Sequence, residues 1–286
     1  MARRKFEGLR VLVTGASQGI GRALVVSAAK RGAKVIAVAR SQSLLEELAA
    51  EVRGSGGTIE IVVGDITVPA DRERMIATAK ERFSGLDVLI NNAGIGATGH
   101  FMDSDPQVLR TIFETNYFAL AEMTRLCLPL LKEGKTPAIV NISSVVGRRA
   151  LPARCLYSAS KFAVQGFSEA IRAELAKDGI DVIVINPGLT QTNFSKNMLE
   201  QKAKIQLDHL RGMTSEEVAE ATLNAVEKGK AEATFTMQGK LLLLVARFAP
   251  WFVDWRAKKT VRKLFAEEIA ERERRKKSRA AAGSSS

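Results

Sequence analysis

Short runs of apolar, largely β-branched residues alternate with longer amphipathic segments along most of the chain. Seven of the runs predict β-strands: Arg10–Thr14, Lys34–Ala39, Ile59–Val63, Val88–Asn91, Ala138–Ile142, Asp181–Asn186 and Glu232–Thr236. The segments between them have helical spacing: Ile20–Arg31, Ser43–Arg53, Pro69–Phe83, Leu109–Leu131, Ser158–Lys177 and Ser215–Lys228. Continuously apolar strands are typical of parallel strands that are covered on both faces. The pattern therefore predicts an α/β fold, a doubly wound parallel sheet of about seven strands.

A glycine-rich loop follows the first predicted strand. Ligands of such sheets bind beyond the carboxyl ends of the strands, and residues 14–21, TGASQGIG, lie at that position, directly before a predicted helix. Gly15 permits a tight turn, Gly19 lets the backbone approach a pyrophosphate, and Gly21 lets the helix pack on the strand. The amino end of the helix then faces the phosphates. The loop predicts dinucleotide binding, with contacts from Gly15, Ser17, Gln18, Gly19, Ile20 and Gly21.

The end of the second predicted strand bears on which dinucleotide binds. An NAD site usually has a carboxylate there, which accepts a hydrogen bond from the ribose 2′-hydroxyl. Here Ala39 occupies that place and Arg40 follows. An arginine can pair with the 2′-phosphate of NADP, and no carboxylate is present to repel that phosphate. We therefore predict NADP(H) rather than NAD(H); the alternative is a solvated Arg40 and a site that does not discriminate.

Tyr157 and Lys161 lie four residues apart in YSASK, a spacing that places both on one face of a helix. A tyrosine with a pKa near its usual value of about 10 is a poor acid–base group at neutral pH. A neighbouring ammonium, together with an oxidised nicotinamide, favours the phenolate and lowers that pKa. The pair predicts a proton donor for a forming alkoxide, although this spacing alone also occurs by chance on solvated helices.

Several motifs occur together at matching positions. The glycine loop has the form Gly-x-x-x-Gly-x-Gly, the fourth predicted strand ends in NNAG, and Ser144 precedes Tyr157 by thirteen residues. In this combination residues 8–236 resemble the short-chain dehydrogenase/reductase family. The resemblance implies hydride transfer between a nicotinamide dinucleotide and a carbonyl or alcohol carbon. It implies catalytic roles for Asn116, Ser144, Tyr157 and Lys161.

The resemblance also implies individual roles. Ser144 hydrogen-bonds the substrate oxygen, Lys161 holds the nicotinamide ribose, and Asn116 interrupts the fourth helix and holds a water of the proton relay; the alternative for Asn116 is a helix-bending residue without a catalytic role. Neighbouring strand residues face opposite ways, so Ser143 and Ser144 cannot both face the substrate. Further cofactor contacts are implied at Asp65, Ile66, Asn92, Ala93, Gly94, Pro187, Gly188, Thr190 and Thr192.

Length and composition limit the remaining possibilities. The chain has 286 residues, of which 46% are hydrophobic and 26% charged, and this suits one large domain, predicted over residues 1–238. Cys127 and Cys155 have no paired spacing, which excludes a disulfide framework and favours a reducing cytosol. The amino terminus is not expected to be a signal peptide. His100 and His209 lack partners at metal-ligand spacing, so no metal is expected.

The resemblance weakens beyond residue 238. We predict an apolar and basic helical extension over residues 239–275, in which Pro250 should begin or break a helix, and a disordered tail over residues 276–286. Eleven basic and four acidic residues between Arg256 and Arg279 carry more than half of the net charge of +12, so we expect no nucleic-acid partner. We favour packing of the extension, with Trp251 and Trp255, on the substrate mouth or on a second subunit. Contact with an anionic membrane is the alternative.

These features predict a cytoplasmic homodimer or homotetramer, with peripheral membrane attachment as an alternative, that reduces a lipophilic ketone with NADP(H). One other hypothesis is a 3-oxoacyl-carrier-protein reductase, which Lys132 and Lys135 near the cleft would favour and Asp178 would not. Another is a non-catalytic NADP-sensing or scaffold protein, which normally lacks the tyrosine or the lysine. The expected substrate loop, residues 190–213, is apolar but does not name the substrate.

Overall fold

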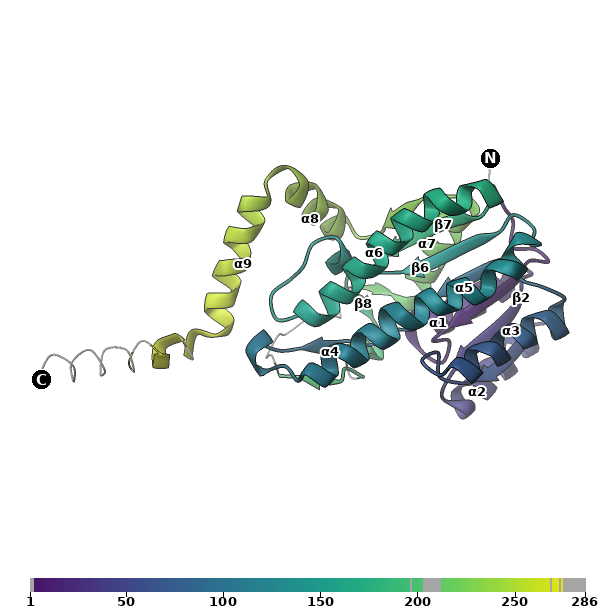
Figure 1. Cartoon of the computed structure of the whole chain (residues 1–286), viewed down its shortest axis with the longest axis horizontal. Coiled ribbons are helices and arrows are strands. Elements are labelled where there is room, and N and C mark those ends of the chain that lie inside the picture. Colours follow the sequence, from purple (N-terminus) through teal and green to yellow (C-terminus); the bar gives the residue numbers. More distant parts are fainter. Residues whose placement is uncertain (1–2, 196, 203–211, 268, 273, 275–286) are drawn as a thin grey trace, which may run out of the picture.

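In the computed structural model the chain forms one three-layer α/β domain with a helical extension (Figure 1). The structure describes residues 3–195, 197–202, 212–267, 269–272 and 274. The predicted tail, residues 276–286, and much of the expected substrate loop, residues 203–211 with His209, lie outside the described residues.

The sheet has seven parallel strands in the order β11-β7-β6-β4-β1-β2-β3, so the prediction of a doubly wound sheet is confirmed. The strands are β1 Arg10–Thr14, β2 Lys34–Ala39, β3 Thr58–Val63, β4 Val88–Asn91, β6 Ala138–Ile142, β7 Asp181–Asn186 and β11 Glu232–Thr234. The last strand is shorter than predicted because Thr236 caps the next helix by accepting a hydrogen bond from the Gly239 amide at 3.1 Å. Four two-residue strands, Ala97–Thr98 (β5), Thr190–Gln191 (β8), Glu200–Gln201 (β9) and Met213–Thr214 (β10), pair beside the sheet.

Helices cover both faces of the sheet, as expected for strands that are apolar throughout. One core contains residues of α1, α2 and α7, and the other contains residues of α3, α5 and α6. The helices are α1 Gly19–Lys30, α2 Gln42–Gly54, α3 Pro69–Phe83, α4 Pro106–Phe113, α5 Ala119–Lys132, α6 Cys155–Leu175 and α7 Ser215–Glu227. Chain order reverses between β1 and β4, and in open α/β sheets ligands bind at the carboxyl ends of the strands beside such a switch point.

The fourth predicted helix differs from the prediction in one respect. Leu109–Leu131 was expected as one helix; the structure has α4, a π-helical segment at Glu114–Phe118, and then α5. Such π-helical turns often mark functional sites. The π segment contains Asn116, the residue at which the family resemblance implied an interruption.

The extension consists of α8 Met237–Phe248 and α9 Pro250–Leu264, and Pro250 begins the second helix. It touches the domain through an Arg149–Asp254 ion pair and an edge-to-face contact between the His100 and Phe265 rings, whose centroids lie 5.1 Å apart. Figure 1 shows α9 standing away from the sheet layers. The exposed apolar face, as we call it, consists of Leu241, Leu244, Phe248, Trp251, Phe252 and Trp255.

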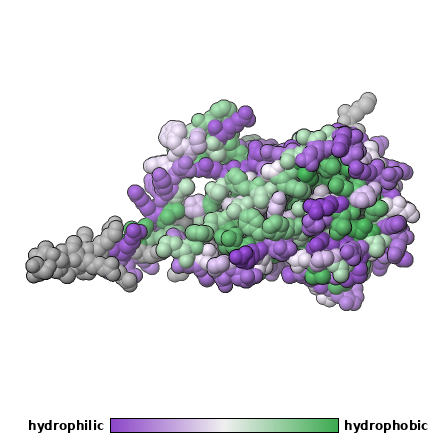
Figure 2. Space-filling model, in the orientation of Figure 1, coloured by the Kyte–Doolittle hydropathy of each residue, from purple (hydrophilic) through white to green (hydrophobic). Residues whose placement is uncertain are grey.

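Hydrophobic side chains are visible at the surface over α8, next to hydrophilic ones farther along the extension (Figure 2). No helix in the described part of the chain has the length and apolar content of a transmembrane span.

Candidate active site

The glycine loop between β1 and α1 is shaped as a dinucleotide site requires. Gly15 and Gly19 have φ angles of +67° and +55°, a region that glycine enters without steric cost. A Cβ atom on Gly21 would lie 2.1 Å from the Gly15 carbonyl oxygen, so only glycine fits there. The methyl group of Thr192, from the loop after β7, lies 3.2 Å from the place of a Cβ on Gly19. The loop after β7 therefore lies directly against the glycine loop.

The amino end of α1 offers donors to an anion. Its N-cap residue, Gln18, makes no capping hydrogen bond with its side chain, and the first turn contains no acidic residue. The first amide groups of a helix have no partner within the helix, and they attract negative charge. Together with the glycines, this end of α1 fits the pyrophosphate of a nicotinamide dinucleotide.

A hydrogen-bonded link joins β1 to the NNAG segment after β4. The Thr14 hydroxyl accepts from the Asn92 and Ala93 amides, each at 3.1 Å. The Asn92 side chain donates to the carbonyls of Thr14 and Gly15 at 3.0 and 3.1 Å. Asn91, by contrast, is buried and donates to Thr124 and Asn141, so it has a structural role.

Arg40 follows β2, and its side chain is exposed. Its guanidinium lies 3.7 Å from the carboxylate of Asp65, which also accepts from the amide and hydroxyl of Thr67. Ala39 is buried. An arginine that is loosely paired in this way can turn toward a ligand at little cost.

One cavity of about 950 Å³ runs along the carboxyl ends of the strands and joins these features. All the predicted cofactor residues line it, as do Ser144, Tyr157 and Lys161; Asn116 does not appear among its lining residues. No described residue of the extension lines the cavity, which runs against the expectation that the extension covers the substrate mouth. The described residues contain no cluster of three or more side chains suited to hold a metal ion.

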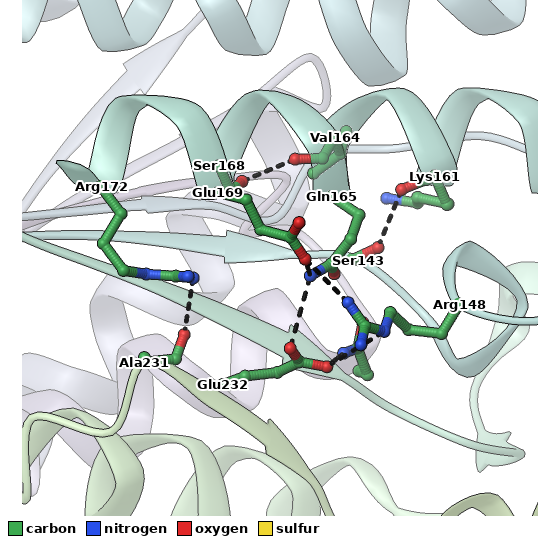
Figure 3. A network of polar contacts seen from close by, with 11 residues as sticks. Ser143, Arg148, Lys161, Val164, Gln165, Ser168, Glu169, Arg172, Ala231 and Glu232 are labelled. Carbon is green, nitrogen blue, oxygen red and sulfur yellow. Dashed lines mark hydrogen bonds and ion pairs between the residues drawn. The ribbon is translucent and has the colours of Figure 1, made fainter. Parts of the chain in front are cut away.

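Helix α6 carries Tyr157 and Lys161. Polar contacts fix this helix to the sheet (Figure 3). Arg172 donates to the Ala231 carbonyl at 2.9 Å. Arg148 bridges Glu169, at 2.7 Å, and Glu232, at 3.5 Å. The helix begins three residues earlier than predicted, at Cys155, so that Tyr157 lies in its first turn. These contacts, made by Glu169 and Arg172, hold the carboxyl-terminal half of α6 beside β11.

Tyr157 and Lys161 point to one region of the cavity but are not in direct polar contact. The Lys161 ammonium donates to the Ile142 carbonyl at 2.8 Å and lies 5.8 Å from the centre of the Tyr157 ring. Burial lowers the pKa of Lys161 to about 8. Burial raises the pKa of Tyr157 to about 12, and the nearby charge of Arg154 and a hydrogen bond with Ser144 oppose this rise. Two cations thus lie near Tyr157 in this structure: Arg154, whose charge opposes the rise of its pKa, and Lys161, whose ammonium faces its ring.

The two serines after β6 have different partners. The Ser143 hydroxyl is buried and donates to the backbone carbonyl of Lys161 at 3.2 Å. The Ser144 hydroxyl accepts from the Val146 amide at 3.3 Å and hydrogen-bonds with Tyr157. Ser144 is thus placed beside the tyrosine, whereas Ser143 is tied to the backbone of α6.

Asn116 links the segment after β4 to helix α6 through its side chain. Its side-chain oxygen accepts from the Ile95 amide at 2.8 Å, and its nitrogen donates to the Ile95 carbonyl and to Ser160, each at 2.9 Å. These protein groups occupy both ends of its side-chain amide. Its role in a proton relay remains a prediction.

Comparison with known proteins agrees with this geometry. The sequence model of the short chain dehydrogenases matches residues 10–203. The chain belongs to this family. Dehydrogenase/reductase SDR family member 7B of Mus musculus is 37% identical over 234 residues, which cover 79% of this chain and 72% of the relative. Ketoacyl reductase HetN of Nostoc sp. is 32% identical over 255 residues, which cover 86% of this chain and 87% of the relative.

Solved structures of the short chain dehydrogenase family resemble the whole domain. One from Burkholderia cenocepacia, in complex with NADP, has a TM-score of 0.75 at 30% identity and covers 89% of this chain and 99% of its own. One from Burkholderia phymatum, in complex with NAD, has a TM-score of 0.80 at 22% identity, with 87% and 96% covered, and shows the shared fold.

Two cavity residues near Tyr157 were missed by the sequence reasoning. Phe194 lies with its ring 5.5 Å from that of Tyr157, and Arg154 lies three residues before the tyrosine. Phe194 was noted only as part of an apolar loop. The position of Arg154, three residues before the tyrosine, was a signal that could have been used, because the residue that caps a helix lies close to its first turn.

Proposed function

We propose that this short chain dehydrogenase transfers a hydride between NADP(H) and a carbonyl or secondary alcohol, and that it reduces lipophilic ketones. The observation that carries the choice of NADP is the end of β2, where Ala39 is buried and the exposed Arg40 lines the cavity. A 2′-phosphate would replace the weak, solvent-exposed contact of Arg40 with Asp65 by a charge-assisted one. The family relative solved with NADP supports the same choice.

A nicotinamide dinucleotide, when bound, would supply or accept the hydride; the remaining steps belong to side chains of the chain. Ser144 orients the substrate oxygen, and Tyr157 donates a proton to that oxygen as it becomes an alkoxide. A phenol whose pKa is raised remains protonated at neutral pH, which suits a donor in the direction of reduction. Lys161, anchored on Ile142, would hold the ribose hydroxyls.

Binding measurements with both cofactors test the proposal for NADP. Arg40→Ala should weaken NADPH binding by about 1.5–3 kcal/mol, the range of a charge-assisted hydrogen bond, and leave NADH binding nearly unchanged. Arg82→Ala is a matched control, because Arg82 is also exposed and paired with a carboxylate, that of Glu60, but lies away from the cavity. Equal losses for NADPH and NADH in Arg40→Ala would contradict the proposal.

Reduction of a 3-oxoacyl thioester is a second candidate, favoured by the similarity to ketoacyl reductase HetN. Lys132 ends α5 and Lys135 lies shortly before β6, at the edge of the sheet opposite the cavity, so these two lysines do not support this candidate. Lys132 is paired with Asp178 at 3.3 Å. Comparing NADPH-dependent rates for a 3-oxoacyl thioester and a simple ketone of equal chain length would separate the two candidates.

We also propose that the extension binds an anionic membrane surface, which would place a cytoplasmic enzyme next to lipophilic substrates. The exposed apolar face contains two tryptophans, and exposed cations follow it on α9: Arg256, Lys258, Lys259, Arg262 and Lys263. Aromatic residues next to cations suit the interface of an anionic bilayer. Packing of the extension on the protein's own substrate mouth is not supported, because no described residue of the extension lines the cavity.

Flotation of the full chain with vesicles tests this attachment. The protein should float with phosphatidylglycerol vesicles at low salt, and less with phosphatidylcholine or at high salt. Replacing Lys258, Lys259, Arg262 and Lys263 by glutamine should release it. If the chain does not float and Trp251→Ser/Trp255→Ser converts a homodimer to a monomer, the occupant of the face is a second subunit.

A further inference from the structure

Arg154 lies at the amino end of α6, lines the cavity and carries a charge without a partner. Its guanidinium atoms Nε and Nη2 are buried and have no hydrogen-bond partner among the described residues. No ion pair in that part of the chain includes it either. It is the N-cap residue of the helix that carries Tyr157, three positions farther on. The cation therefore faces the same end of the cavity as the proton donor.

Arg72 and Arg149 also have a buried Nε atom without a partner, but another nitrogen of each is bonded, that of Arg149 to Asp254. Arg4 is paired with Asp181 and Arg10 with Asp87, and Arg72 donates to the Ile66 carbonyl at 2.6 Å. Burying a cation without a partner is costly, and burial accordingly lowers the pKa of Arg154. Arg154 differs from these arginines because its guanidinium has no hydrogen bond or ion pair among the described residues.

The backbone before Arg154 is held in an unusual conformation. Ala153 has a φ angle of +59°, in the left-handed region that residues with a side chain rarely enter. The Gly99 amide donates to the Ala153 carbonyl at 3.0 Å, and the nearby Leu156 is buried against Ala97 and Ile112. Strain that is maintained by surrounding contacts is typical of binding and catalytic sites. These contacts fix the point at which Arg154 enters the cavity.

We propose that Arg154 binds an anionic group of the substrate, a carboxylate or a phosphate, a few bonds from the reacting carbonyl carbon. The proposal rests on the proposed reduction of a carbonyl at Tyr157. Arg154 caps the helix three positions before Tyr157, and both side chains line the cavity, so the anionic group should lie close to the reacting carbonyl. A guanidinium matches the two oxygens of such a group. The cofactor phosphates are expected at other residues of the cavity, Gly15, Gly19 and Arg40.

A matched pair of substrates tests the preference for an acid. The wild type should reduce phenylglyoxylate with a higher kcat/KM than its methyl ester. Arg154→Gln should lower kcat/KM for the acid by about 10- to 100-fold, the loss of a charge-assisted hydrogen bond, and lower it for the ester much less. Any effect of Arg154 on the pKa of Tyr157 acts on both substrates, so it cancels in the ratio. Arg154→Lys should keep part of the preference.

Arg148→Gln is the control for charge, because Arg148 lies outside the cavity and pairs with Glu169 and Glu232. It should leave the acid-to-ester ratio unchanged. An equal ratio in the wild type and in Arg154→Gln would overturn the proposal, as would a preference of the wild type for the ester.

A binding experiment separates this proposal from the proposed reaction. Calorimetry with the wild type, free and with NADP⁺, should show tighter binding of benzoate or phenylphosphonate than of neutral benzamide. Arg154→Gln should lose that preference while keeping its melting temperature. The tighter of the two anions identifies a carboxylate or a phosphate. Retention of the anion preference by Arg154→Gln would overturn the role of Arg154, whereas absence of ketone turnover with intact anion binding would overturn only the reaction.

Discussion

The cavity wall and the C-terminal extension place large and charged side chains in opposite environments. In the cavity wall Lys161 is buried, yet its ammonium donates to a carbonyl, and Asn116 has three hydrogen bonds. In the extension Trp251 and Trp255 are 71% and 52% exposed, although tryptophan is among the side chains that gain most from burial.

The contrast indicates how substitutions in each region should affect folding and binding. The catalytic domain is held by contacts within the chain, so substitutions at its tightly packed positions, such as Gly21, should change folding and binding together. The extension has few such contacts, so substitutions on its exposed apolar face should change binding to another surface and leave folding almost unchanged. Three substitutions, in order of decreasing effect on stability, test this difference.

Lys161→Met should change how stability depends on pH. In the folded protein the pKa of Lys161 is about 8, and its usual value is 10.5. Between these values the unfolded chain binds a proton that the folded chain has released, so Lys161 contributes a gain in stability as the pH rises. The gain should reach about 2–3 kcal/mol by pH 10 and be absent in Lys161→Met. Urea unfolding without cofactor measures it.

The exposed Lys177 offers a matched control, since Lys177→Met should follow the wild-type pH dependence. Parallel stability curves for the wild type and Lys161→Met would show that Lys161 is not buried as described.

Gly21→Ala should damage folding and cofactor binding at once. The new Cβ would lie 2.1 Å from the Gly15 carbonyl oxygen and 2.4 Å from the Asn92 side-chain nitrogen, so the glycine loop must move. We expect a loss of about 1–3 kcal/mol in the free energy of unfolding, the usual cost of overpacking, and weaker NADPH binding. Gly54→Ala, at the end of α2 with no atom within 4 Å of the new Cβ, should do neither. Unaltered NADPH affinity in Gly21→Ala would contradict the tight fit of the loop.

Trp251→Ala/Trp255→Ala should have the smallest effect on folding. Exposed positions usually contribute less than about 0.5 kcal/mol, and we expect a change of that size in urea unfolding. Leu12→Ala, in the core, is the comparison: it should lower the free energy of unfolding by about 2–5 kcal/mol. A loss of several kcal/mol in the tryptophan variant of the isolated monomer would show that the extension is packed on its own domain after all.

The same contrast explains how much could be predicted from the sequence. The parallel strands and the glycine loop follow from local patterns, because continuously apolar runs and glycines at fixed spacing have few structural solutions. The positions of Ser144, Tyr157 and Lys161 at one cavity follow from their places at the carboxyl ends of strands or on the next helix.

Other features depend on contacts that sequence spacing does not contain. The left-handed Ala153 is held by Gly99, more than fifty residues away, so Arg154 could not be placed beside Tyr157 with its charge unpaired. The raised pKa of Tyr157 results from burial, which the spacing of Tyr157 and Lys161 does not reveal. Trp251 and Trp255 are exposed in the single chain. The pattern of apolar and basic residues therefore could not decide which other surface binds them.

The kinetics of Tyr157→Phe test the central claim most directly. With NADPH and an aliphatic ketone such as 2-decanone, the substitution removes only the proton donor. It should lower kcat/KM by about 10²–10⁴-fold and change the NADPH Kd by less than about twofold. Retention of more than about a tenth of the wild-type kcat/KM would mean that another group donates the proton, and the account of this site would then be wrong.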